Sequence, residues 1–214
     1  MRIVCLSDTH NCNERIIVPD GDLLIHSGDA TTVGSAEQIF RFNKWFTALP
    51  HQRKIFVAGN HDCLFETDNE RARSILDDSI DYLQDSTVVV GGLKIYGSPW
   101  QPRFFDWAFN LQRGPEMAAK WRLIPDDVEI LVTHGPPHGI LDTVPRAFGF
   151  ENAGCEELRK RVDELLENGR LKLHVFGHIH FGHGSEIHGG GQFVNAATCN
   201  DDYLPTNQPI VIDI

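Results

Sequence analysis

The sequence predicts an α/β fold with a single domain. Short apolar runs rich in valine, isoleucine and leucine alternate with stretches of helical periodicity, which is the pattern of strands that alternate with helices. The chain has 214 residues, of which 41% are hydrophobic, so it can form one sizeable core but is short for two typical domains and a linker. No repeat or low-complexity tract interrupts it. We therefore expect one domain that spans residues 1–214.

The apolar runs give the expected strands, because each run has strand length and is bounded by turn-forming or polar residues. Strands are expected at residues 2–7, 23–27, 54–58, 129–133, 172–176, 192–195 and 210–214. Residues 87–96 should form a hairpin, because Gly91 and Gly92 suit its turn. Residues 97–114 carry five aromatic side chains with little periodicity, which predicts an ordered loop that could form a pocket wall.

Helices are indicated by capping signals and by apolar residues at helical spacing. One helix should begin near Ser35, where the sequence Ser-Ala-Glu-Gln fits a capping box ahead of an apolar stripe. A second is expected over residues 68–76. A third is expected over residues 155–168, with Gly169 as its stop signal.

Composition excludes some classes of partner. The formal net charge is −11, with 30 acidic and 19 basic residues, so no broad positive surface is expected for long DNA or RNA. The five cysteines form no C-x-x-C pair, which predicts free thiols in a reducing compartment. The sequence contains neither a signal-peptide core nor a membrane-length apolar stretch. We therefore expect a cytoplasmic protein without a membrane partner, and the sequence leaves its oligomeric state open.

Polar residues able to bind metal follow five of the expected strands. These residues are Asp8, Asp29, Asn60, His134 and His178. The carboxyl ends of strands in α/β sheets converge on one crevice, so these side chains are expected to meet. In Asp8-Thr9-His10 and in His178-Ile179-His180, one residue separates the two polar side chains. An extended backbone would direct both side chains of each pair to the same side.

The residue types predict two divalent cations. Carboxylate oxygens, an amide oxygen and imidazole nitrogens suit manganese, iron or zinc better than calcium. Asp29 has no neighbouring ligand, and we expect its carboxylate to give one oxygen to each of two ions. Two ions ~3.5–4 Å apart would bind an attacking hydroxide and the phosphoryl oxygens of a substrate, and would lower the pKa of bound water toward ~7. Manganese is the first expectation, and iron, zinc and nickel are the others.

The motifs D-x-H, G-D, G-N-H-D, T-H-G-P-P and G-H-x-H, in this order, resemble the calcineurin-like metallophosphoesterases over nearly the whole chain. The resemblance implies a four-layered α/β/β/α sandwich, in which helices flank two mixed sheets. It also implies that His61 is the catalytic histidine. One metal would be held by Asp8, His10, Asp29 and His180, and the other by Asp29, Asn60, His134 and His178. The loop motifs further resemble the small metallophosphoesterase-domain-containing phosphodiesterases of animals and their bacterial relatives.

Other residues keep two interpretations at this point. His61 could support the metal ligands without taking part in the reaction. Trp100 could stack on a base or pack in the core, Arg103 could meet a phosphate or lie exposed, and His138 could line the substrate pocket because it lies near a motif. Gly21-Asp22 also reads as G-D, but it precedes its strand, so we interpret it as a turn.

The function expected first is hydrolysis of a small phosphodiester, with cyclic nucleotides among the candidates, so the expected partner is a small-molecule phosphate ester. A second possibility is a phosphomonoesterase that acts on nucleotides or phosphoproteins, because the same metal pair can serve both ester types. A third, of another class, is a binding scaffold without turnover. The complete ligand series and the presence of His61 argue against the scaffold.

Overall fold

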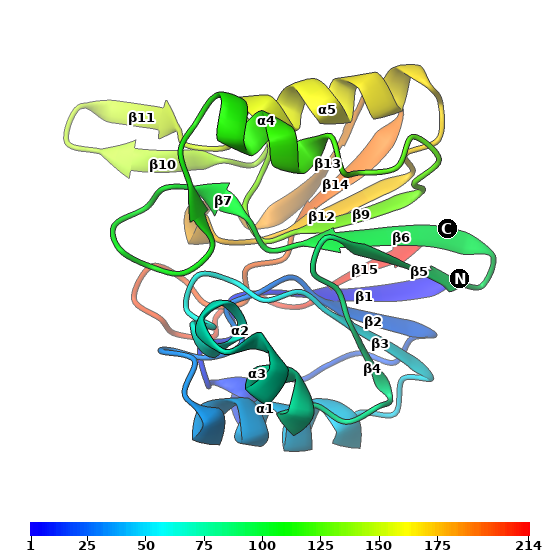
Figure 1. Cartoon of the computed structure of the whole chain (residues 1–214), viewed down its shortest axis with the longest axis vertical. Helices are drawn as coiled ribbons and strands as arrows, with labels where there is room; N and C mark the ends of the chain where they lie inside the picture. The colour runs from blue at the N-terminus through cyan, green and yellow to red at the C-terminus, as the bar shows by residue number, and fades with distance from the viewer.

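The computed structural model describes residues 1–214 and shows four layers, α/β/β/α, as the family resemblance implies (Figure 1). One sheet has the order β15 (Ile210–Asp213), β1 (Arg2–Leu6), β2 (Leu23–His26), β3 (Arg53–Phe56) and β4 (Ile80–Tyr82). The other has the order β13 (Gly184–His188), β14 (Gly191–Asn195), β12 (Leu173–Phe176), β9 (Ile130–Thr133), β6 (Leu93–Ser98) and β5 (Ser86–Val90). Strands β15, β13 and β5 are antiparallel edge strands, whereas the inner pairings are parallel.

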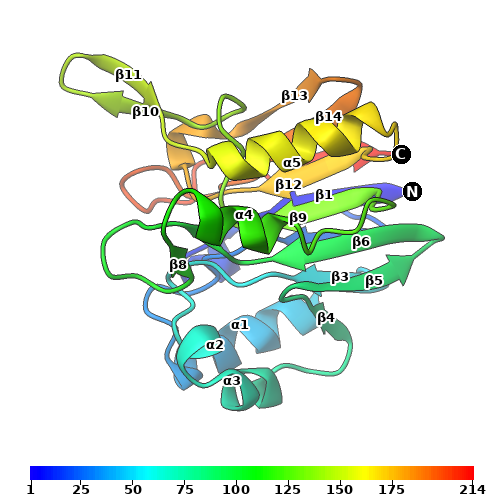
Figure 2. The ribbon, with the colours of Figure 1, turned by 45° about the horizontal axis from the view of Figure 1, so that its top comes forward.

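Helices cover the outer face of each sheet (Figure 2). Helices α1 (Ala36–Ala48), α2 (Leu64–Thr67) and α3 (Asn69–Ile75) pack on the β1–β4 sheet. Helices α4 (Pro115–Trp121) and α5 (Glu156–Glu167) pack on the other sheet. No helix is both long enough and apolar enough to span a bilayer.

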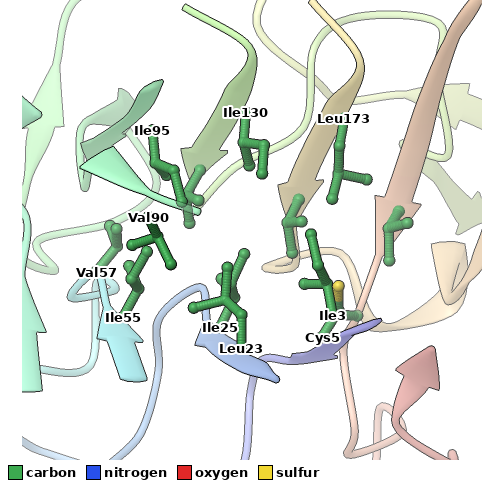
Figure 3. Close-up of a cluster of buried hydrophobic side chains, with 14 of the residues drawn as sticks. Ile3, Cys5, Leu23, Ile25, Ile55, Val57, Val90, Ile95, Ile130 and Leu173 are labelled. Atoms are coloured by element: carbon green, nitrogen blue, oxygen red, sulfur yellow. The ribbon is translucent and has the colours of Figure 1, made fainter. Parts of the chain in front are cut away.

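Most residues of the inner strands are buried, on one face or the other, which explains why these strands are rich in valine, isoleucine and leucine. In β1, Ile3 and Cys5 point into the aliphatic core between the sheets (Figure 3). Val4 and Leu6 point the other way and contact the core beneath the helices. Because successive side chains of a strand face opposite sides, one apolar run supplies two cores.

The predicted long helices and the hairpin are confirmed. Ser35 caps α1, because its side chain accepts a hydrogen bond from the Gln38 backbone N–H. The Gln38 side chain bonds to the Val33 N–H, so only half of the expected capping box forms. Gly169, with φ of 66°, follows the end of α5. The turn between β5 and β6 contains Gly91 and Gly92, both with positive φ.

The sequence patterns missed the short elements. The aromatic segment 97–114 is ordered as expected, but it also contains the end of β6 and the two-residue strands β7 (Gln101–Pro102) and β8 (Asn110–Leu111). The other missed elements are η1 (Asn13–Arg15), α2, β4, α4, β10 (Thr143–Arg146), β11 (Gly149–Asn152), η2 (His180–Gly182) and β13. Strands β10 and β11 form a hairpin that projects from the body (Figure 1). Most of their side chains are exposed, so no apolar alternation marks them in the sequence.

His174, on β12, makes folding sensitive to pH. Its side chain is fully buried, and its Nε2 lies 2.8 Å from the Thr133 hydroxyl oxygen. That hydroxyl donates to the Gly135 carbonyl, so His174 must be the donor to Thr133. Burial lowers the pKa of His174 to about 3, whereas a histidine in the unfolded chain takes up a proton near pH ~6.5. The unfolded state therefore gains the proton first as the pH falls.

We expect this side chain to remove about 2 kcal/mol of stability between pH 7 and pH 5. Urea unfolding at the two pH values should show a loss of stability in His174→Gln that is smaller than the wild-type loss by about that amount. His188→Gln is the control, because the His188 side chain is 39% exposed. Equal losses in the wild type and His174→Gln would contradict the expectation.

Candidate metal centre

The predicted ligands gather at the rim where the parallel strands end. The structure brings Asp8, His10 and His180 together in one group, and Asp29, His134 and His178 in another. In each group the candidate ligand atoms lie within 4.8 Å of one another. Segments distant in the sequence therefore meet at one place, as the strand-end pattern predicted.

The first group consists of two imidazoles and a carboxylate. His180 Nε2 lies 3.3 Å from Asp8 Oδ1 and 3.3 Å from His10 Nε2. His10 Nε2 also lies 3.8 Å from Asp29 Oδ2. These atoms can surround one cation, and Asp29 lies between this group and the group around His134.

The second group is built around His134. Its Nε2 lies 2.9 Å from Asn60 Oδ1 and 3.5 Å from Asp29 Oδ2, and its ring centroid is 5.0 Å from that of His178. Asp29 Oδ2 thus faces both groups, whereas Asp29 Oδ1 accepts a hydrogen bond from the His61 backbone N–H. The expectation that each oxygen of Asp29 serves one ion is therefore not supported, because a single oxygen faces both groups.

Four histidines at the centre are oriented by hydrogen bonds from Nδ1, which leaves Nε2 to face the centre. In each of them Nδ1 lies 2.7–3.3 Å from a backbone carbonyl oxygen. They are His10, His61, His134 and His180, with the carbonyls of Thr31, Thr32, Ser27 and Asn200 as the respective partners. A carbonyl only accepts, so Nδ1 carries a proton, and Nε2 is the nitrogen whose lone pair can bind a cation when the ring is neutral. This donor set fits divalent cations.

The backbone at the ligands differs from the extended conformation that the sequence suggested. Four predicted ligands have left-handed φ angles: Asp8 (52°), His10 (41°), Asp29 (53°) and His178 (67°). Side chains of the D-x-H and G-H-x-H motifs therefore reach the centre from strained turns beyond the strand ends. Such conformations cost on the order of 1–3 kcal/mol each and persist where the surrounding structure fixes them.

Two motif glycines allow the backbone to approach the carboxylates. A Cβ atom at Gly59 would lie 2.3 Å from Asp29 Oδ1, and one at Gly177 would lie 2.0 Å from Asp8 Oδ2. Either contact is too short for a real side chain. The glycines of G-N-H-D and G-H-x-H thus leave room for the predicted ligands.

The buried carboxylates remain ionised because of their neighbours. Burial alone would raise the pKa of Asp29, but the charge and hydrogen bond of His134, followed by the charge of His10, hold it below its usual range. For Asp8, His180 likewise outweighs burial and lowers the pKa. Asp29 in turn raises the pKa of His134 to about 9 against the effect of burial. Buried anions of this kind need positive charge beside them, which imidazolium groups or cations can supply.

His61 lies at the edge of the centre. Its Nε2 is 4.0 Å from Asp29 Oδ2, and it forms a further possible ligand group with His10 and Asp29. One face of its ring packs on Trp107, with the centroids 4.0 Å apart. Its position is thus fixed by Trp107, by the Thr32 carbonyl and by its own backbone bond to Asp29.

Asp62 is a site residue that the sequence reasoning did not assign. Its buried carboxylate accepts hydrogen bonds from the backbone N–H groups of Gly59, Ala30 and Thr31, and from the Thr31 hydroxyl. It therefore ties the loop after β2 to the loop after β3. Burial, together with the charge of Asp29, raises its pKa to about 6. Its place in G-N-H-D was a signal that could have identified it.

A cavity of about 480 Å³ opens onto the centre. Its lining includes Asp29, Asn60, His61, His178, His180, Arg103, Phe104, Arg113, Arg146, Phe181 and Tyr203. Arg103 thus reaches the cavity, although it pairs with Asp106 at 2.6 Å. Trp100 and His138 do not belong to the lining. Trp100 donates to Asp85, with Lys120 over its ring, so its polar group is used inside the protein.

Comparison with known proteins agrees with this geometry. Residues 1–182 match the family model described as Calcineurin-like phosphoesterase. The chain is 44% identical to the human metallophosphoesterase domain-containing protein 1, in an alignment that covers all of this chain and 71% of that protein. Two Caenorhabditis elegans UPF0046 proteins are each 37% identical, over all of this chain and 75% and 81% of their own lengths. The matched range contains every predicted ligand and His61, and the chain belongs to the calcineurin-like phosphoesterase family.

Proposed function

We propose that the protein hydrolyses small phosphodiesters with two divalent cations, held by the two ligand groups that share Asp29. The position of Asp29 Oδ2 is the observation that supports this most directly, since it lies 3.5 Å from His134 Nε2 and 3.8 Å from His10 Nε2. A shared carboxylate oxygen between two groups is suited to a paired centre and not to two independent sites. Manganese is the proposed metal, with iron, zinc and nickel as alternatives.

Two cations at this centre would supply Lewis-acid polarisation of the phosphoryl group and a water of lowered pKa. The protein's own side chains supply orientation and proton transfer. The carbonyl partners of the imidazoles fix the ring planes, so the Nε2 atoms remain directed at the centre. His61 presents Nε2 beside Asp29 at the cavity wall, where a histidine can protonate the leaving oxygen.

Two features of the cavity support the proposal of a diester substrate over a monoester. Beyond the centre its wall includes the apolar residues Pro102, Phe104, Pro136, Val144 and Phe181, on which the second ester substituent of a diester could pack. A monoester carries more negative charge than a diester, so arginines without carboxylate partners would favour its binding. Two of the three arginines in the lining are already paired with carboxylates, Arg103 with Asp106 and Arg146 with Glu151.

The test compares bis-(p-nitrophenyl) phosphate with p-nitrophenyl phosphate at a fixed metal concentration. We expect a higher kcat/KM for the diester with the manganese-loaded protein, and two ions per chain when metal is measured on the same sample. A panel of cyclic nucleotides, nucleotides and simple diesters then identifies the substrate class.

Each alternative has its own outcome. A higher kcat/KM for the monoester would replace the diester proposal with a phosphomonoesterase. No hydrolysis by protein loaded with manganese, iron, zinc or nickel would instead favour a binding scaffold. In every case the acidic chain, with a net charge of −11, disfavours long nucleic acids as partners.

A further inference from the structure

Tyr203 lies directly over the candidate metal centre. Its ring centroid is 4.7 Å from that of His10, 5.6 Å from that of His180 and 6.2 Å from that of His61. It also belongs to the cavity lining, and 48% of its surface is exposed. An aromatic residue in this position is accessible to whatever enters the cavity.

The hydroxyl of Tyr203 has no hydrogen-bond partner in the protein, unlike those of the other two tyrosines. Tyr82 donates to Gln84 Oε1 at 2.8 Å, and Tyr96 donates to Asp85 Oδ1 at 3.5 Å. A phenolic hydroxyl can donate one hydrogen bond and accept others. The Tyr203 donor is therefore free to bond to a ligand in the cavity.

The chain holds Tyr203 in this place against a conformational cost. Its φ is 58°, a left-handed value that is unfavourable for a bulky residue and is associated with functional sites. The Tyr203 backbone N–H donates to the Asn200 carbonyl, and Asn200 Oδ1 accepts from the backbone N–H groups of Asp202 and Leu204. The same Asn200 carbonyl is the partner of His180 Nδ1. The turn that carries Tyr203 is thus bonded to a predicted ligand.

We propose that Tyr203 contacts the substrate: its hydroxyl donates a hydrogen bond to a non-bridging phosphate oxygen of the ester, and its ring covers the His10 and His180 side of the site. The inference rests on the proposed function, because it requires a phosphate group at this centre. A hydrogen bond to an anionic oxygen is stronger than one between neutral groups. No covalent bond changes at Tyr203, so its role is to bind and orient the phosphate.

Two variants separate the hydroxyl from the ring. Tyr203→Phe keeps the ring, and we expect it to lower kcat/KM for bis-(p-nitrophenyl) phosphate by about 10- to 100-fold. Binding of inorganic phosphate to the manganese-loaded protein, measured by calorimetry, should weaken by a similar factor while the metal content stays unchanged. Tyr203→Ala should lower kcat/KM and phosphate affinity further than Tyr203→Phe, because the ring is also removed. Tyr96→Phe is the control, since its hydroxyl bonds to Asp85 and Tyr96 is not in the cavity lining.

The outcomes distinguish this inference from the proposed function. If Tyr203→Phe matches the wild type in kcat/KM and in phosphate affinity, the role of the hydroxyl is overturned and the proposed function stands. If the wild type hydrolyses no ester but binds phosphate, the proposed function fails, and the phosphate affinity of Tyr203→Phe still decides the inference. If the wild type neither hydrolyses an ester nor binds phosphate, both the proposed function and the role of Tyr203 are overturned.

Discussion

Replacing His61 by alanine is expected to lower turnover by roughly 10²–10⁴-fold, the contribution of a positioned general acid, while two metal ions per chain are retained. The reason lies in how the side chain is held. Its Nδ1 proton bonds to the Thr32 carbonyl at 2.7 Å, and Trp107 packs against the ring. Nε2 is therefore the nitrogen left to exchange a proton with a leaving oxygen in the cavity.

The leaving group shows whether the loss arises from proton donation. A p-nitrophenolate leaves readily without a proton, whereas an alkoxide or an unsubstituted phenolate needs one. We therefore expect the loss in His61→Ala to be smaller for bis-(p-nitrophenyl) phosphate than for diphenyl phosphate. Equal losses on the two substrates would indicate a role in binding or charge stabilisation.

Metal analysis decides between the two structural interpretations of His61. The candidate ligand atoms of His61, His10 and Asp29 lie within 4.8 Å of one another, so the geometry alone would also allow His61 to bind a cation. Metal content below that of the wild type would identify His61 as a ligand. Unchanged turnover on diphenyl phosphate would remove it from the mechanism. His138→Ala is the matched control, because His138 is not in the cavity lining.

The α/β class and the strand-end ligands could be predicted because both leave local signals in the sequence, whereas the four-layered arrangement was implied by the family resemblance. After Arg2, β1 is apolar from Ile3 to Leu6 because these residues are buried, alternately on its two faces. Asp8, Asp29 and His134 each follow such a run, and parallel strands bring their carboxyl ends to one rim. Knowledge of the strands was therefore enough to predict which polar residues would meet.

Features that depend on long-range packing could not be predicted in this way. Tyr203 reaches the centre from a turn that no apolar pattern marks, and only the folded chain places it over His10. Trp100 was a candidate for the pocket, yet its indole N–H bonds to Asp85, a partner that spacing does not reveal. The left-handed backbone of Asp8 was missed because the D-x-H spacing alone suggested an extended strand.

Replacing Asp29 by asparagine is expected to lower turnover by on the order of 10³-fold and to reduce the metal content below two ions per chain. The His61 backbone N–H donates to Asp29 Oδ1 at 2.8 Å, so the asparagine oxygen should take that position. The opposite orientation would set two N–H donors against each other. The amide NH₂ group would then face His134 and His10, where it has neither a lone pair nor a charge to offer a cation.

Asp22→Asn is the matched control for this change. Asp22 lies in the same Gly-Asp dipeptide pattern, but it precedes β2, and its carboxylate accepts a hydrogen bond from the Arg2 backbone N–H. We expect turnover and metal content to remain at the wild-type level. A loss in Asp22→Asn as large as that in Asp29→Asn would mean that general destabilisation, and not the metal centre, explains both.

Asp8→Asn shows whether Asp29 is shared by two cations or serves one. Asp8 Oδ1 lies 3.3 Å from His180 Nε2 and 3.9 Å from His10 Nε2, within the first group. Its replacement should therefore lower the affinity for one ion and leave the affinity for the other near the wild-type value. Asp29→Asn should lower the affinity for both ions, because Asp29 Oδ2 faces His10 and His134. If a metal titration shows that each variant loses affinity for only one ion, Asp29 serves a single cation. The centre then consists of two separate sites.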